Sequence, residues 1–201
     1  LQSVEGAGLE NDTIVLYFSD NCPNSCRWNG GMKGRKGSLD EGGLRVPCLI
    51  RWPGRISPGK RIPQIAGAID LLPTFAELTG VRLQGGKPLD GRSLAPLLLT
   101  DGADWPERTI FSMQGKRVSA RTQGYRLDAQ GRLFDMAADP MQDHDVSGTQ
   151  PEVAARLRAE ATAWQAEMLP FAGEAHRPFT VGYAKNTILP AREGEPQGGV
   201  E

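Results

Sequence analysis

Two largely apolar runs stand out near the start of the chain. Residues 13–18 read Thr-Ile-Val-Leu-Tyr-Phe. Because apolar and polar positions do not alternate there, the run predicts a strand over 13–19 that is buried on both faces. Residues 46–51 predict a second strand. The glycine-rich residues 20–44 predict a long loop, and a loop of that length in a compact domain is usually functional or disordered.

Apolar positions three to four residues apart predict two helices in the next segment. The first is expected to begin at Asp70, which can cap it, and to end at Gly80, with Pro73 tolerated in its first turn. The second is expected to be shorter and to be capped by Ser93. The apolar residues expected on the buried faces are Ile69, Leu72, Phe75, Ala76 and Leu78 in the first helix, and Leu94, Leu97 and Leu98 in the second.

The pattern changes to short strands after about residue 106. Residues 109–113, 117–120, 125–128 and 132–136 are separated by glycines and predict an antiparallel meander. A helix is expected to start at Pro151 and to pack on this sheet through Val153, Leu157, Ala161, Trp164 and Met168. The sequence therefore predicts an α/β part over 1–105, a small sheet-and-helix unit over 106–170 and an irregular tail over 171–201.

Composition narrows the class of protein. The chain has 201 residues with 39% hydrophobic content, so it is long enough to form one domain with a sizeable core. A net charge of −1 gives no reason to expect nucleic acid or an anionic membrane as a partner. No run approaches the roughly 18 apolar residues of a membrane span. The first residues lack a signal-peptide pattern and are expected to be the tail of a helix cut in mid-domain.

The three cysteines do not predict a disulfide framework, because their number is odd. Cys22 and Cys26 are spaced so that a zinc site has to be considered. A tetrahedral site needs a second pair of Cys or His ligands, and His144 and His176 lie far away in the sequence. A zinc site is therefore not expected.

Candidate chemistry lies at the end of the first predicted strand and in the loop after it. Asp20 and Asn21 offer the carboxylate and amide oxygens that hard cations such as Ca²⁺ bind. Taken alone, this dipeptide more often begins a turn. The ammonium group of Lys36 suits a sulfate or phosphate oxygen, and its alternative is a solvated surface lysine like Lys33. Together the groups suggest chemistry on a sulfate or phosphate ester.

The same residues carry a family resemblance. Ser-Asp-Asn after an apolar strand, followed by Lys-Gly-Ser-x-x-Glu-Gly-Gly-x-Arg-Val-Pro and by Arg-Trp-Pro-Gly, resembles the second half of the formylglycine-dependent sulfatases. Later segments at 69–74, 78–80, 90–94, 133–136 and 139–140 also fit, so the resemblance covers about residues 8–170. The family's Cys-x-Pro-Ser-Arg segment, which carries the nucleophile, is not in this sequence.

The resemblance implies a fold and an activity. It implies the C-terminal portion of an alkaline-phosphatase-like α/β sandwich, followed by a small antiparallel sheet with a packed C-terminal helix. It implies hydrolysis of sulfate esters, with Ca²⁺ bound by Asp20 and Asn21 together with ligands from a missing N-terminal half. Lys36 would contact the sulfate and stabilise the leaving group. The nucleophile would be the hydrated aldehyde of a modified Cys or Ser upstream of Leu1.

The resemblance also suggests a substrate and supporting residues. A sulfated small molecule or carbohydrate is the expected partner, in a periplasmic or secreted protein. Glu41 and Arg45 are expected to brace the loop, with tight backbone approach at the two glycines between them. Weaker candidates for substrate contacts are Arg27, Trp28 and Asn29 in the loop and His176 and Arg177 in the tail.

Each of these weaker candidates also has an explanation that involves no function. For the tryptophan at 28, an ordinary core or surface position is at least as well supported as a sugar contact, and the basic residues near 176 fit a solvated tail. Cys22 and Cys26 have the wrong spacing for the nucleophile motif and are rejected for that role.

Two alternative functions remain open on the sequence. One is a phosphoester hydrolase of the same superfamily, which would need a Ser or Thr nucleophile and usually two zinc ions with several His ligands. The chain contains only two histidines. The other is a truncated or degenerate homologue without catalytic activity.

Overall fold

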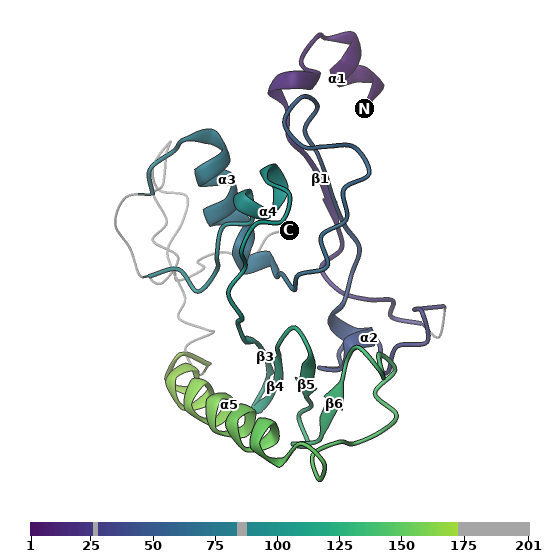
Figure 1. Ribbon diagram of the computed structural model, residues 1–201, viewed down its shortest axis with the longest axis vertical. Helices are drawn as coiled ribbons and strands as arrows, with labels where there is room; N and C mark the ends of the chain where they lie inside the picture. The colour runs from purple at the N-terminus through teal and green to yellow at the C-terminus, as the bar shows by residue number, and fades with distance from the viewer. Residues whose placement is uncertain (26–27, 84–87, 173–201) are drawn as a thin grey trace, which may run out of the picture.

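The computed structural model describes residues 1–25, 28–83 and 88–172 (Figure 1). It is a mixed α/β structure with two antiparallel sheets, one of two strands and one of four. Its elements in chain order are α1 (Gln2–Gly6), η1 (Glu10–Asp12), β1 (Val15–Phe18), α2 (Glu41–Leu44), β2 (Cys48–Arg51), η2 (Ala68–Asp70), α3 (Leu71–Thr79), α4 (Ala95–Leu99), β3 (Ile110–Gln114), β4 (Arg117–Arg121), β5 (Tyr125–Leu127), β6 (Leu133–Asp135) and α5 (Pro151–Ala172).

The expectation that residues 13–19 form a strand buried on both faces is wrong for this chain. β1 pairs with β2 in an antiparallel ribbon, with Val15 opposite Arg51 and Phe18 opposite Cys48. Tyr17 and its partner Leu49 are 65% and 63% exposed. An apolar strand is buried on both faces when helices cover its sheet. Among the described residues, the ribbon has no third strand.

The two predicted helices form, although the faces of the first differ from expectation. α3 follows Asp70 and ends at Gly80, whose φ of 71° places it in the left-handed region that favours glycine. Ile69 and Leu72 are exposed, whereas Thr74 is fully buried. In the second helix, α4, the predicted apolar residues form a core cluster of Leu94, Leu97 and Leu98, against which Ile50, Leu78 and Trp105 pack.

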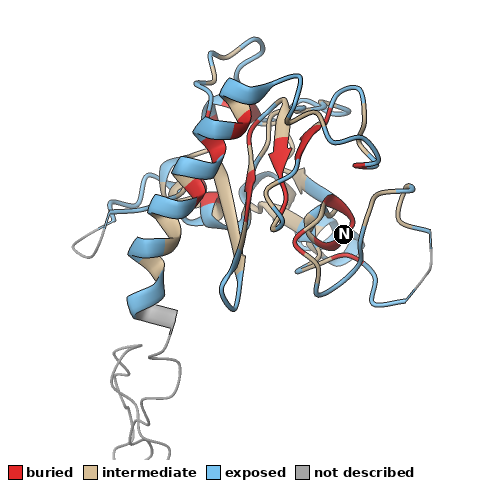
Figure 2. Cartoon of the chain, turned by 90° about the horizontal axis from the view of Figure 1, so that it is seen from below, coloured by how far each residue is buried: buried red, intermediate tan, exposed pale blue. Residues whose placement is uncertain are grey.

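The small sheet and its helix confirm the predicted meander. The strands follow the order β3-β4-β5-β6, each antiparallel to the next. α5 lies across them, and Figure 2 shows buried residues where this long helix faces the strands. The Phe111 and Trp164 rings stack with centroids 5.2 Å apart. The core beneath consists of Ala120, Leu127, Leu133, Ala154, Leu157 and Ala161.

A buried aspartate connects the α/β part to the small sheet. The Asp70 side chain is fully buried and accepts backbone N–H bonds from Gly67 and Arg92, each 2.8 Å long. Arg108, which precedes β3, donates to the same carboxylate at 2.8 Å. A Cβ on Gly91 would lie 1.9 Å from the Ile69 carbonyl oxygen, so residues 90–92 pack directly on this turn. The turn at Asp70 and residues 90–92 therefore hold the two parts of the structure together.

No helix within the described part of the chain is long and apolar enough to cross a bilayer.

Candidate functional site

Asp20 and Asn21 lie directly after β1, where the ribbon ends. Asp20 is exposed and Asn21 is half-buried. The Asn21 side-chain amide donates a hydrogen bond to the Asp20 carboxylate, and the Ser19 hydroxyl donates to the Asn21 carbonyl at 2.9 Å. The two side chains therefore face each other and present oxygen atoms suited to a hard cation.

Backbone contacts bring the Lys36 backbone to the segment that follows Asn21. The Lys36 N–H donates to the Pro23 carbonyl at 3.1 Å, and the Cys22 N–H donates to the Gly43 carbonyl at 3.4 Å. These bonds fix residues 20–23 against the loop and against α2. The Lys36 side chain is exposed. The structure thus places an oxygen-rich pair and an exposed ammonium group on neighbouring segments.

The two glycines of α2 allow the loop to pack directly on this short helix, as predicted. A Cβ on Gly42 would lie 2.6 Å from the Gly34 carbonyl oxygen and 2.7 Å from that of Lys33. A Cβ on Gly43 would lie 2.3 Å from the Ser38 carbonyl oxygen. Real Cβ atoms do not approach so closely, so any larger residue would push the loop away.

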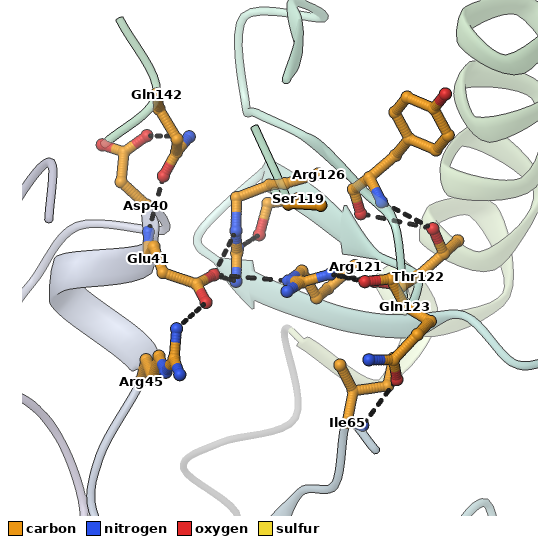
Figure 3. Close-up of polar contacts among 12 residues, drawn as sticks. Asp40, Glu41, Arg45, Ile65, Ser119, Arg121, Thr122, Gln123, Arg126 and Gln142 are labelled. Carbon is orange, nitrogen blue, oxygen red and sulfur yellow. Dashed lines mark hydrogen bonds and ion pairs between the residues drawn. The ribbon is translucent and has the colours of Figure 1, made fainter. Parts of the chain in front are cut away.

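Glu41 is a buried carboxylate surrounded by three arginines (Figure 3). Its Oε2 accepts from Arg126 Nε at 3.0 Å and Nη2 at 2.7 Å, and from Arg121 Nε at 3.4 Å. Arg45 Nη1 lies 3.6 Å from its Oε1. The expectation that Glu41 braces the loop is confirmed, whereas the Arg45 side chain makes, among the described residues, only this exposed contact with Glu41. The arginines of β4 and β5 were not anticipated.

Gln142 holds the start of α2 from the other side. Its Oε1 accepts the Glu41 backbone N–H at 2.8 Å, and its Nε2 lies 3.5 Å from an Asp40 carboxylate oxygen (Figure 3). Gln142 is buried, and its φ of 60° is unusual for a residue other than glycine. Such backbone strain persists where the surroundings determine the conformation.

Lys33 is not a solvated lysine, so the comparison drawn from the sequence is wrong. Its Nζ lies 3.5 Å from an Asp40 oxygen and 3.6 Å from an Asp128 oxygen. It also lies 5.0 Å from the centre of the Phe134 ring. Asp128 is buried on the small sheet. Lys33 therefore ties the loop to that sheet, because long-range packing places a carboxylate and a ring beside it.

The remaining candidates have varied surroundings. The side chain of Trp28 is 89% exposed. The amide of Asn29 donates to the carbonyls of Met32 at 2.7 Å and Gly34 at 3.0 Å, so it supports the loop. Arg27, His176 and Arg177 lie outside the described residues. A role in substrate binding remains a prediction for all five.

Cys22 is poorly suited to act as a nucleophile. Burial raises the pKa of its thiol, and the nearby Glu41 carboxylate raises that pKa further. The thiol therefore stays protonated at neutral pH, and the thiolate is the reactive form. Its Sγ donates to the Arg45 carbonyl.

The donor set for a cation is chemically suitable but incomplete within the described segments, which contain no group of three His, Cys, Asp or Glu side chains able to hold a metal. Ca²⁺ takes about six to eight oxygen ligands, and Asp20 with Asn21 supplies only some of them. Other residues or waters have to provide the rest.

Sequence reasoning missed Arg121, Arg126 and Gln142, which lie 80 to 101 residues from Glu41 along the chain. No short motif reaches so far. The only local signal is a charged residue in the middle of the apolar β5 strand, at Arg126.

Comparisons with known proteins identify relatives. The Sulfatase family model matches residues 1–81. Mouse steryl-sulfatase is 40% identical over 121 residues, which are 55% of this chain and 19% of that protein. Human arylsulfatase A is 40% identical over 116 residues, which are 55% of this chain and 22% of that protein. The chain thus spans about a fifth of the length of these relatives.

Solved structures agree on the fold. The crystal structure of Ps i-CgsB superposes with a TM-score of 0.71 at 25% identity, covering 82% of this chain and 39% of that one. The PsFucS1 sulfatase from Pseudoalteromonas sp. gives a TM-score of 0.70 at 20% identity, over 82% of this chain and 39% of its own. The neighbours are sulfatases of the alkaline-phosphatase-like fold, and the sequence and structure matches together show that this chain resembles part of a sulfatase.

Proposed function

We propose that the chain forms part of the active site of an enzyme that hydrolyses sulfate esters. The observation that carries the proposal is the hydrogen bond from the Lys36 backbone to the Pro23 carbonyl, which brings the backbone of an exposed lysine to the segment that directly follows the Asp-Asn pair. Relatives named as sulfatases match this region. An oxygen-rich pair suits a cation and an ammonium group suits an anion, so the arrangement suits a sulfate group held between them.

Asp20 and Asn21 are the residues that would hold Ca²⁺ in this proposal. When bound, the ion would withdraw charge from the sulfate oxygens as a Lewis acid. Asp20 supplies a charged ligand that neutralises part of the ion's charge. Asn21 would bind a cation through its amide oxygen, which its hydrogen bond to Asp20 leaves free because the amide nitrogen is the donor. In this proposal, residues outside this sequence would supply the remaining ligands.

Lys36 would act on the sulfate and the leaving group. A cation placed where negative charge develops in the transition state lowers the barrier by about 2.7–4 kcal/mol in comparable cases. The exposed side chain lets Lys36 reach a substrate in solution, while its backbone is held by Pro23. The nucleophile in this proposal is a formylglycine outside this sequence, as the family resemblance implies. Cys22 is a poor alternative, because burial raises the pKa of its thiol and its Sγ donates to the Arg45 carbonyl.

A sulfated carbohydrate is the substrate class that we favour, although another sulfated small molecule fits the same chemistry. Ps i-CgsB, which is 26% identical, was crystallised in complex with k-i-k-neocarrahexaose. Mouse N-acetylgalactosamine-6-sulfatase is 31% identical over 130 residues. Steryl-sulfatase, at 40% identity, favours a non-carbohydrate alternative. Such an enzyme would act in the periplasm or outside the cell.

The test uses the full-length gene product that contains this chain. Turnover of p-nitrophenyl sulfate and of sugar sulfates should fall with Asp20→Ala, together with bound calcium measured by elemental analysis. Lys36→Ala should lower kcat/KM by about two to three decades. Lys116→Ala, at an exposed turn position of the small sheet, is the matched control and should have little effect.

Three results would contradict the proposal. Unchanged calcium content in Asp20→Ala would mean that this residue only begins a turn. Turnover of phosphate esters in place of sulfate esters would favour the phosphoester hydrolase. No turnover of either ester would favour a degenerate homologue.

A further inference from the structure

We propose that Arg126 and Gln142 are positioning residues that set the place of Lys36 by clamping Glu41 from two sides. This inference rests on the proposed role of Lys36 at the sulfate. Both residues come from the small sheet-and-helix unit, β5 for Arg126 and the segment after β6 for Gln142. The small unit would thereby determine catalytic geometry in the α/β part.

Arg126 holds the side chain of Glu41. It is buried, and two of its nitrogens donate to one carboxylate oxygen at 2.7 and 3.0 Å. Its third nitrogen donates to the Leu39 carbonyl at 3.0 Å, just before α2. One planar guanidinium therefore fixes both the carboxylate and the backbone that leads into the helix. A lysine keeps the charge but cannot make this set of contacts.

Gln142 holds the backbone of Glu41. Its amide oxygen accepts the Glu41 N–H, one of the groups that a helix start leaves without a partner inside the helix. The side chain is buried, and its own backbone has a φ of 60°. The conformation is thus kept despite its cost. Together the two residues leave α2 little freedom to rotate or shift.

The backbone of α2 packs directly against the backbone of the loop, so the position of α2 determines the position of the loop. The Gly42 N–H donates to the Lys33 carbonyl at 2.7 Å. A Cβ on Gly43 would lie 2.7 Å from the Arg35 carbonyl oxygen, directly before Lys36 in the chain. Backbone touches backbone at these points, so a displacement of α2 displaces residues 33–36. The clamp therefore influences the position of Lys36 through the contacts of Gly42 and Gly43 with the loop backbone before Lys36.

The clamp is better explained by placement than by stability alone. A buried ion pair costs desolvation, and apolar packing of similar volume often stabilises a protein as well or better. Glu41 and its arginines lie outside both apolar core clusters. They occupy the junction between the loop of the proposed site and the small sheet (Figure 3).

The test measures how Arg126→Lys and Gln142→Asn change leaving-group sensitivity in the full-length gene product. Asparagine tolerates positive φ but is too short to reach the Glu41 N–H. Arg117→Lys, an exposed arginine on neighbouring β4, is the matched control. Each variant is assayed for kcat/KM with a sugar sulfate, whose leaving group is poor, and with p-nitrophenyl sulfate, whose leaving group is good.

We expect both clamp variants to lose about 10²-fold with the sugar sulfate, the scale of a small misplacement of a catalytic group. The loss with p-nitrophenyl sulfate should be clearly smaller, because nitrophenolate needs less stabilisation by Lys36. The control should match the unchanged protein. A smaller fraction of folded protein lowers both substrates equally, so an equal loss, or none, overturns the clamp.

Absence of turnover in the unchanged protein would instead refute the proposed function, and the clamp with it. If Arg126→Lys fails to fold, Gln142→Asn alone decides, since it leaves the ion pairs in place.

Discussion

Replacing Glu41 with glutamine should destabilise the chain strongly, because it removes the carboxylate that pairs with the buried Arg126. Glu41 is 3% exposed, and the Arg126 side chain is 5% exposed. Breaking a buried pair by neutralising one partner costs about 3–5 kcal/mol, since the other charge stays buried without compensation. Arg45 adds little, because its side chain is 62% exposed and an exposed pair is worth about 0–1 kcal/mol.

Urea unfolding of the Glu41→Gln chain beside the unchanged chain measures this loss, from the midpoint and the slope. Glu5→Gln is the matched control. It removes a carboxylate from a pair with Arg51 whose side chains are 44% and 36% exposed, so we expect a loss of about 0–1 kcal/mol. Equal losses in the two variants would refute the view that the buried carboxylate anchors the loop. A change confined to the slope would point instead to an altered denatured state.

Two further predictions concern the glycines and the acid range. Gly42→Ala should cost about 1–3 kcal/mol in unfolding free energy, because its Cβ would meet two carbonyl oxygens, whereas Gly124→Ala, with nothing within 4 Å, should be nearly neutral in the same urea assay. Hydrogen bonds from Ser147 lower the pKa of Asp145 below its usual value, so its contribution to stability is present above about pH 4 and is lost as the pH falls through the folded value. Tm measured from pH 5 down to pH 2 should therefore fall less steeply in Asp145→Asn than in the unchanged chain, and parallel curves would contradict the assignment.

Local signals predicted most of the secondary structure. The strands of the small sheet and the packed helix α5 follow from alternation, turn glycines and helical periodicity, all of which act over a few residues. Burial of the first strand could not be predicted in this way. An apolar run indicates that a strand can be buried. Whether it is buried depends on which other elements pack against it, and a local pattern does not contain that information. In this chain Tyr17 and Leu49 are exposed instead.

The site was predictable only to the extent that its residues are close in sequence. Asp20, Asn21 and Lys36 lie within seventeen residues, and the motif order already placed them in one loop region. The clamp could not be foreseen, because Arg126 reaches Glu41 across 85 residues and Gln142 across 101. Lys33 shows the same limit, since its surroundings come from Asp128 and Phe134.

The structure separates the residues of the recognition motif into two physical kinds. Glu41, Gly42 and Gly43 are buried and hold the loop by ion pairs and backbone contact. Asp20 and Lys36 are exposed and can meet a ligand. Much of the motif therefore identifies an architecture, and that architecture would persist in a homologue that had lost its activity. Function is decided at the exposed residues, so variants of Asp20 and Lys36 distinguish an enzyme from a degenerate relative, whereas variants of the buried residues test how the site is built.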